Sequence, residues 1–174
     1  MAIIVGIIGF ILYFIYDINQ VRFHHKLLNY CFFIGCIMMV ISTLSLLKYD
    51  IKCYWGVVVV IIGVILEIYV LFFALDYKDT YIDNRFKVCD KKAYALCRHP
   101  GFYSFLIIYL GLWLTYQNAL AFWMFIIYDL LNFSYICFQD HYTFMHTFDN
   151  YGDYKKRVPF LIFNKNSIKR CFRG

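Results

Sequence analysis

The sequence predicts an all-α protein, an integral membrane bundle of about five transmembrane helices followed by an amphipathic, cytoplasmic C-terminal segment. The 174 residues are 63% hydrophobic and only 16% charged, whereas soluble domains are about half apolar and about a quarter charged. Long apolar runs recur along the chain, and basic residues concentrate in alternate connections between them. A 22% aromatic content also excludes a disordered chain.

Five apolar runs define the predicted helices, and they cover residues 2–16, 27–47, 54–75, 102–116 and 119–138. A hydrocarbon core about 30 Å thick requires roughly 20 helical residues. The second, third and fifth runs are long enough, and the fourth is expected to form a tight hairpin with the fifth around Gln117 and Asn118. The first run has neither the basic start nor the cleavage site of a signal peptide, so we expect it to stay attached as a helix.

Basic residues test this arrangement, because they collect on the cytoplasmic side of a membrane protein. Of the 17 Lys and Arg residues, 15 lie in the first loop, the third loop and the tail, against Lys48 and Lys52 in the second loop. We therefore expect a multi-pass protein with the N-terminus outside and the third loop and C-terminus in the cytoplasm. Residues 1–174 form a single domain in this interpretation, with a cytoplasmic segment at 139–174. The basic tail is also expected to contact anionic membrane lipids.

The seven cysteines are odd in number and form no close C-x-x-C pair, so neither a disulfide framework nor a metal site is expected. Several of them lie in or beside apolar runs, where a free cysteine behaves as a small buried hydrophobe. Nucleic-acid binding is not expected either, since the basic residues flank apolar runs and no recognition motif accompanies them. No obligate protein partner is evident from the sequence.

Two carboxyl groups, Glu67 and Asp129, lie inside predicted spans, where an ionisable residue usually faces the bundle interior or a cavity. Packing between helices is an equally good interpretation for both. Asp129, Asn132, Gln139 and Asp140 follow one another at near-multiples of 3.6 residues and can share a helical face. Such a polar stripe predicts a cavity that opens toward the cytoplasmic end.

A second polar concentration covers residues 94–103, just before the fourth run. Pro100 and Gly101 interrupt the helix and allow close backbone approach to a ligand, while Arg98 and His99 offer hydrogen-bond donors. An ordinary helix start with Arg98 at the membrane edge is the alternative. The aromatic and basic run at 151–159 predicts an interfacial helix that ends at Pro159.

Taken together, these segments resemble the isoprenylcysteine carboxyl methyltransferases, part of a wider group of membrane methyltransferases that includes phospholipid methyltransferases. The resemblance runs from about Asp79 to Phe163 and consists of R-H-P-G-F at 98–102, an apolar hairpin, Q-D at 139–140 and Y-G-D-Y-K-K-R-V-P at 151–159. It implies S-adenosyl-L-methionine as the cofactor, no metal, and a lipid-like or prenylated small molecule as the methyl acceptor.

The resemblance also implies roles for particular residues. The catalytic assignments are Arg98 and Asp140, and the substrate assignments are Asn132, Tyr151, Tyr154 and Arg157. Residues assigned to cofactor binding are Lys87, Val88, Tyr94, His99, Pro100, Phe102, Gln139 and Asp140.

Some positions depart from the pattern of that family. Phe102 replaces a Tyr, Ser104 stands where Gly is common, and Lys92-Ala93 replaces a common Gly-Pro. Gln139-Asp140 replaces a Glu-Glu pair, and Ile136 replaces an Arg that serves the substrate carboxylate. These changes affect the identity of the substrate more than the binding of the cofactor, so methyl transfer to a lipophilic substrate is the expectation.

Two other functions stay open at this point. Membrane sterol and steroid reductases also carry an H-P segment and a Tyr-rich, basic tail that ends in Pro, and they bind a nicotinamide dinucleotide. The D-H-Y-T-F-M-H-T-F run at 140–148 is similar to that ending. A small, non-catalytic membrane scaffold is the second alternative, because the changes at Phe102 and Gln139 weaken the motif.

Overall fold

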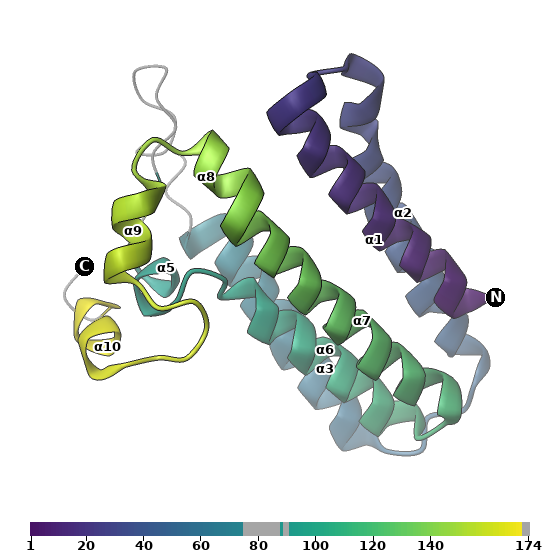
Figure 1. The fold of residues 1–174 in the computed structure, drawn as a ribbon. Helices are drawn as coiled ribbons and strands as arrows, with labels where there is room; N and C mark the ends of the chain where they lie inside the picture. The colour runs from purple at the N-terminus through teal and green to yellow at the C-terminus, as the bar shows by residue number, and fades with distance from the viewer. Residues whose placement is uncertain (75–87, 89–90, 172–174) are drawn as a thin grey trace.

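The computed structural model describes residues 1–74, 88 and 91–171, and every regular element among them is helical (Figure 1). This confirms the predicted all-α membrane bundle. The apolar helices are α1 (Ala2–Ile18), α2 (Tyr30–Leu44), α3 (Tyr54–Ile68), α6 (Gly101–Tyr116) and α7 (Ala119–Phe138). Shorter helices are α5 (Ala93–Leu96), α8 (Phe144–Thr147), α9 (Tyr151–Arg157) and α10 (Lys165–Cys171).

Several helices are longer than the apolar runs suggest, because π-helical or 3₁₀ turns continue them. Four continuous stretches are long and apolar enough to cross a membrane: Ala2–Phe23, Lys26–Lys48, Tyr54–Ala74 and Ala119–Thr147. The first and the last extend well beyond the predicted ends at residues 16 and 138. The segment predicted to leave the membrane at residue 139 therefore begins as a continuation of the α7 helix.

The α6 helix is the short member of the bundle. Its 16 residues span about 24 Å at 1.5 Å per residue, which is less than a hydrocarbon core. It joins α7 through the predicted hairpin. Gln117 adopts a left-handed backbone (φ 46°), and the Asn118 side chain accepts a hydrogen bond from the backbone N–H of Ala121 at 2.8 Å. Asn118 thus caps α7, as an Asn at this position commonly does.

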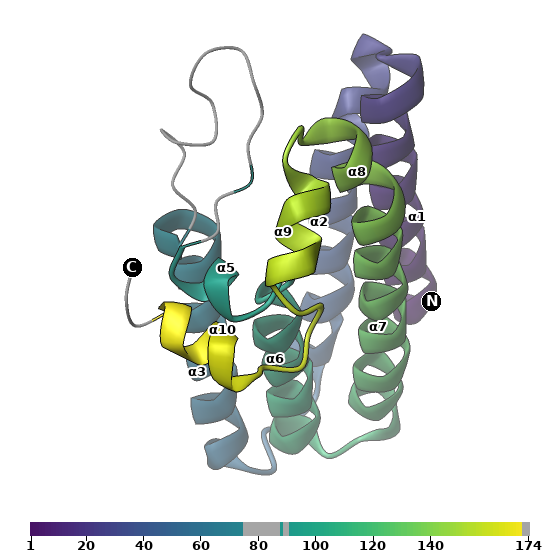
Figure 2. The same cartoon turned by 60° about the vertical axis from the view of Figure 1, so that its left-hand side comes forward.

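Two helical groups make up the bundle. The α1 and α2 helices pack against each other as one pair, α3 packs against α6, and α7 contacts both α6 and α1 (Figures 1 and 2). The outward faces carry large exposed apolar side chains such as Phe33, Ile65 and Phe72. Such a surface suits lipid rather than water.

The two ends of the bundle carry different elements. The turn after α1, the short helix α5, and α8 and α9 lie at one end, while the α2–α3 and α6–α7 connections lie at the other (Figures 1 and 2). Arg22, Lys26 and the basic residues of α9 are therefore at the first end, and Lys48 and Lys52 are at the second. This grouping agrees with the predicted charge partition; which side of a membrane each end faces stays a prediction.

Candidate functional site

A buried carboxylate, Asp140, is the centre of the polar structure at the first end of the bundle. Its side chain projects from the π-helical turn Gln139–Thr143 that follows α7, and its residue is 0% exposed. An isolated buried carboxylate is costly unless charges and hydrogen bonds compensate it. A π-helical turn inserts an extra residue into the helical register, and here Asp140 lies within that turn.

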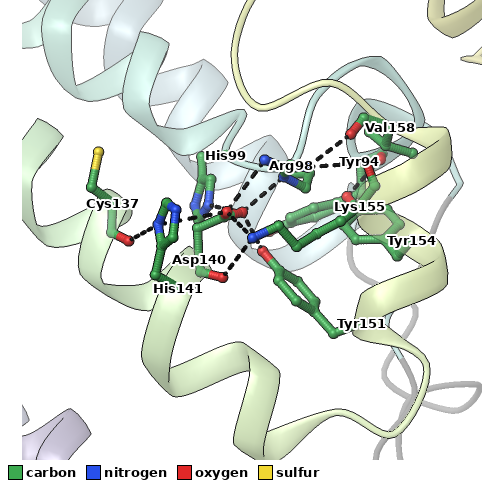
Figure 3. Close-up of polar contacts among 10 residues, drawn as sticks. All are labelled: Tyr94, Arg98, His99, Cys137, Asp140, His141, Tyr151, Tyr154, Lys155 and Val158. Atoms are coloured by element: carbon green, nitrogen blue, oxygen red, sulfur yellow. Dashed lines mark hydrogen bonds and ion pairs between the residues drawn. The ribbon is translucent and has the colours of Figure 1, made fainter.

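Four side chains from two parts of the chain, the residues just before α6 and the helix α9, satisfy this carboxylate (Figure 3). The Arg98 Nε lies 2.8 Å from Oδ1, and the Lys155 Nζ lies 3.0 Å from Oδ2. The Tyr151 hydroxyl donates to Oδ1 at 2.6 Å, and the His99 Nε2 lies 3.4 Å from the same oxygen. We call Arg98, His99, Asp140, Tyr151 and Lys155 the carboxylate cluster. It ties the start of α6 and the helix α9 to the end of α7.

Arg98 is held at both its side chain and its backbone. Its Nη1 donates to the carbonyl oxygens of Lys155 (3.2 Å) and Val158 (3.3 Å) at the C-terminal end of α9. Its backbone N–H donates to the carbonyl oxygen of Pro159 at 3.0 Å. The guanidinium also lies over the ring of Phe160, 5.5 Å from its centroid, a cation–π contact. All of these donors bond to other groups of the protein, so Arg98 connects the start of α6 to the C-terminal segment.

His99 lies deeper in the same cluster, and its residue is 6% exposed. Its ring stacks on Phe144 (centroids 5.7 Å apart, 12° between planes) and meets Phe160 edge-on. Burial lowers the pKa of His99, although the neighbouring Asp140 opposes this shift. A neutral imidazole whose Nε2–H donates to Asp140 keeps Nδ1 as an acceptor.

The two tyrosines of α9, Tyr151 and Tyr154, attach this helix to the rest of the protein. Tyr154 donates a hydrogen bond to the carbonyl oxygen of Tyr94 at 2.8 Å, and both Tyr151 and Tyr154 are at least 98% buried. Burial raises the pKa of both hydroxyl groups, and for Tyr151 the hydrogen bond to Asp140 raises it further. Both phenols are therefore neutral at physiological pH. The interfacial helix predicted at 151–159 is present as α9, but its tyrosines fasten the tail rather than line a cavity described here.

A cavity of about 370 Å³ lies next to the cluster, between α1, α2, α3, α6 and α7. We call it the inner cavity. Seven of the predicted site residues line it: Tyr94, Arg98, His99, Pro100, Phe102, Asn132 and Gln139. Glu67 and Ile136 line it as well, and most of the remaining wall is aromatic or aliphatic.

The other predicted site residues lie elsewhere. The carboxylate of Asp140 is turned into the cluster, and Val88 donates its backbone N–H to the Asn150 side chain at 2.8 Å. Arg157 is exposed on α9. Lys87 lies outside the described residues. The polar stripe predicted along α7 is also divided: Asn132 and Gln139 face the inner cavity, whereas Asp129 faces a different one.

A second cavity of about 660 Å³ adjoins the first and shares Phe32, Tyr135, Gln139 and Phe144 with it. We call it the outer cavity. It is more polar, and its further lining residues include Asp17, Gln20, His24, Thr143 and His146. Asp17 is 3% exposed, and Thr143 donates a hydrogen bond to its Oδ2 at 3.1 Å.

Sequence reasoning missed Asp17. The apolar run stops at Tyr16 because the next residue, Asp17, is charged, yet the α1 helix continues to Ile18 and buries this carboxyl. The signal available was a single acidic residue directly after a long apolar run. Asn19 is equally buried; its side chain accepts from the His25 backbone N–H at 2.8 Å and donates to the His25 carbonyl at 3.1 Å, which closes the turn after α1.

Two departures from the methyltransferase pattern have local explanations. The Ser104 hydroxyl bonds to the carboxyl of Glu67, and its Oγ also lies 2.9 Å from the Gly101 carbonyl oxygen. The hydroxyl therefore gives Glu67 a partner between α3 and α6. Lys92 has a φ of 51°, a conformation that favours glycine, and its Nζ donates to the Phe73 carbonyl at 2.7 Å.

Comparison with protein families decides the relationship of this chain, since one family profile matches residues 1–157. The chain belongs to the DUF1295 family. That family is described as a protein of unknown function. The DUF1295 match includes all five apolar helices and reaches the end of α9, so every member of the carboxylate cluster falls inside it. Comparison with curated proteins finds no match, and comparison with solved structures finds none.

Proposed function

We propose that this protein transfers a methyl group from S-adenosyl-L-methionine to a lipophilic substrate within the membrane. The observation that carries the proposal is the pair of adjoining cavities. The outer cavity is polar, the inner one is largely apolar, and the two share one wall. A reaction between a water-soluble cofactor and a lipid-like acceptor needs two compartments of this kind in contact. The R-H-P-G-F motif lies at the inner one.

The residues of the outer cavity fit a positively charged cofactor. Asp17 supplies a buried carboxylate, Gln139 and Thr143 supply further polar groups, and Tyr16 and Phe148 supply aromatic surface for an adenine ring. Among the described residues, no Lys or Arg lines this cavity. A nicotinamide dinucleotide carries several phosphate charges, for which Arg and Lys are the usual partners. A sulfonium with an amino group is the better electrostatic match.

S-adenosyl-L-methionine supplies an electrophilic methyl group, which needs in-line placement of a nucleophile and exclusion of water. In this proposal Arg98, Asp140, Tyr151 and Lys155 of the carboxylate cluster position the site and take no part in the reaction. Arg98 and Asp140 fasten α6 and α9 around the cavities, which closes the site from water and fixes Pro100 and Phe102 on the wall. A carboxylate acceptor requires no general base. For an amine acceptor, neutral His99 is the base within the cavity wall.

Titration calorimetry of the detergent-solubilised protein tests the proposal. S-adenosylhomocysteine is expected to bind with measurable heat, and NADPH is expected to give none. Asp17→Asn should weaken the binding of S-adenosylhomocysteine at least tenfold, since a charge-assisted contact is lost. The matched control is Asp153→Asn, because Asp153 is an exposed α9 carboxylate paired with Lys156 at 2.9 Å. Binding of NADPH alone would reject methyl transfer.

A reductase is the second candidate, and one observation favours it: the H-P segment at 99–100 and the D-H-Y-T-F-M-H-T-F run at 140–148 are similar to segments of membrane sterol and steroid reductases. The same titration separates the two candidates. Binding of NADPH without S-adenosylhomocysteine supports a reductase. Folded, monodisperse protein that binds neither cofactor supports a non-catalytic scaffold.

A further inference from the structure

A carboxyl group in the middle of α7, Asp129, has no hydrogen-bond partner among the residues that the structure describes. The residue is 8% exposed, and neither of its side-chain oxygens accepts a hydrogen bond from any described residue. The other two carboxyls of the apolar helices, the half-buried Glu67 and the buried Asp17, differ in this respect. Glu67 is bonded by Ser104, and Asp17 is bonded by Thr143. A buried polar group without a partner is costly, and in a membrane no bulk water is present to replace one.

Asp129 lines a cavity of about 290 Å³ that is separate from the inner and outer cavities in most of its wall. The other lining residues, all apolar, are Phe102, Leu106, Phe125, Ile126, Leu130 and Phe133. They come from α6 and α7, which lie side by side (Figures 1 and 2). Leu130 is 62% exposed and Phe133 is 43% exposed, so the cavity opens on the outer, lipid-facing surface of the bundle.

We propose that the Asp129 cavity binds the amino group of a long-chain amine that reaches it sideways from the bilayer. The apolar wall suits an aliphatic chain, and the open side faces the lipid. Two acceptor oxygens without partners require at least two donors. An ammonium has three N–H donors and the opposite charge, whereas an alcohol has a single O–H donor. An acyl tail offers no donor and leaves the carboxyl unsatisfied.

This site does not depend on the proposed methyl transfer. Asp129 contacts no member of the carboxylate cluster, and the cavity shares only Phe102 with the inner cavity. Amine binding and cofactor binding can therefore succeed or fail separately.

Photolabelling in nanodiscs tests the site. The discs contain phosphatidylcholine, whose quaternary headgroup has no N–H donor. The probe is a 16-carbon primary amine with a diazirine in the chain, and its comparison is the 16-carbon alcohol with the same diazirine. Mass spectrometry locates the adducts. We expect saturable labelling of peptides within 119–138 that is at least fivefold stronger with the amine and is displaced by unlabelled hexadecylamine.

Variants link the labelling to the carboxyl. Asp129→Asn should reduce it at least fivefold, Asp129→Glu should retain most of it, and the surface control Asp153→Asn should leave it unchanged. Leu130→Trp narrows the mouth of the cavity while it leaves the carboxyl intact, and it should lower labelling severalfold. If Asp129→Asn does not fold, Leu130→Trp alone tests whether the cavity binds the amine.

Three results would overturn the proposal. The first is equal labelling by the amine and the alcohol, which indicates simple partition into the bilayer. The second is unchanged labelling in Asp129→Asn or Leu130→Trp. The third is a dimer in size-exclusion chromatography whose dissociation is needed for labelling, which assigns the surface to a second copy of the chain.

Discussion

The two ends of the bundle differ in how closely their helices approach one another. At the end with the α6–α7 hairpin, small residues allow backbone contact: a Cβ on Gly111 would lie 2.7 Å from the Val60 nitrogen, and one on Gly56 would overlap the backbone of Thr115. Toward the other end, the inner and outer cavities separate α1 and α2 from α6 and α7. Small residues are the usual means of close helix packing in membranes.

Large aromatic side chains occupy the end that contains the inner and outer cavities, which we call the open end. Tyr13 contacts Phe32 and Tyr135 at ring-centroid distances of 5.4 and 5.6 Å, and these rings leave space beside them. The carboxylate cluster joins α9 to α7 at this end, beside an apolar core of Tyr151, Tyr154 and Val158. Close backbone packing and ligand space therefore lie in different halves of the same helices, and each of the following changes tests this division.

The largest expected effect is at the carboxylate cluster. Asp140→Asn removes the negative charge that Arg98 and Lys155 share, and it leaves buried cationic groups without compensation. Loss of one partner from a buried ion pair typically costs about 3–5 kcal/mol. We expect a large drop in the melting temperature of the detergent-solubilised protein and early proteolysis of the tail after Thr147.

Asp153→Asn is the control for this change, because the pair between Asp153 and Lys156 is exposed and exposed pairs contribute little. If Asp140→Asn melts like the wild type, the cluster does not hold the open end together.

At the end with the α6–α7 hairpin, Gly56→Ala places a methyl group against the backbone of α6. Overpacking of this kind costs about 1–3 kcal/mol, so we expect a smaller decrease in the melting temperature. Gly152→Ala in α9 is the matched control, since a Cβ there meets nothing within 4 Å. An equal response of the two variants would show that close contact between α3 and α6 is not what stabilises this end.

A smaller effect is expected at Tyr128, which joins three helices. Its hydroxyl lies 2.5 Å from the Ser42 Oγ and 3.4 Å from the Ala2 carbonyl oxygen. Tyr128→Phe removes these bonds and retains the ring, and a typical hydrogen bond contributes about 1 kcal/mol net. Thermal unfolding measures the loss. Cofactor binding in the same variant should be unchanged, because Tyr128 lines neither the inner nor the outer cavity.

The smallest effect concerns pH and the open end. Burial lowers the pKa of His99 in the folded protein, so the unfolded chain takes up the proton first as the pH falls. The contribution of His99 to stability is then complete above its ordinary pKa of about 6.5 and is lost below it. Melting temperatures between pH 8 and pH 5 should fall more steeply in the wild type than in His99→Gln. Parallel curves would show that His99 is not buried as a neutral ring.

Most residues of the site at the open end could be predicted from the sequence, but the contacts between them could not. Arg98, His99, Asp140 and Tyr151 each stood out as residues of a site, yet nothing in their spacing indicates that they contact one another. The π-helical turn at Gln139–Thr143 shifts the register at this point, and a prediction based on 3.6 residues per turn does not include it. For this reason Asp140 is turned into the carboxylate cluster, away from the cavity that Asn132 lines. Asp129 and Asn132 both lie in the regular part of α7 and line different cavities.

The sequence by itself determined that the helices are apolar enough to lie in lipid, and how many apolar helices there are. Lipid imposes the same requirement on every span, namely a long apolar run whose backbone groups bond to one another. It also determined the hairpin at Gln117 and Asn118, whose capping hydrogen bond is local, and it predicted a helix at 151–159, which the structure ends at Arg157. Only the tertiary structure decided which carboxyls have partners. Asp17, Glu67 and Asp140 gain theirs from other helices, and Asp129 gains none within the described part of the chain, since a partner depends on which helix packs against each face.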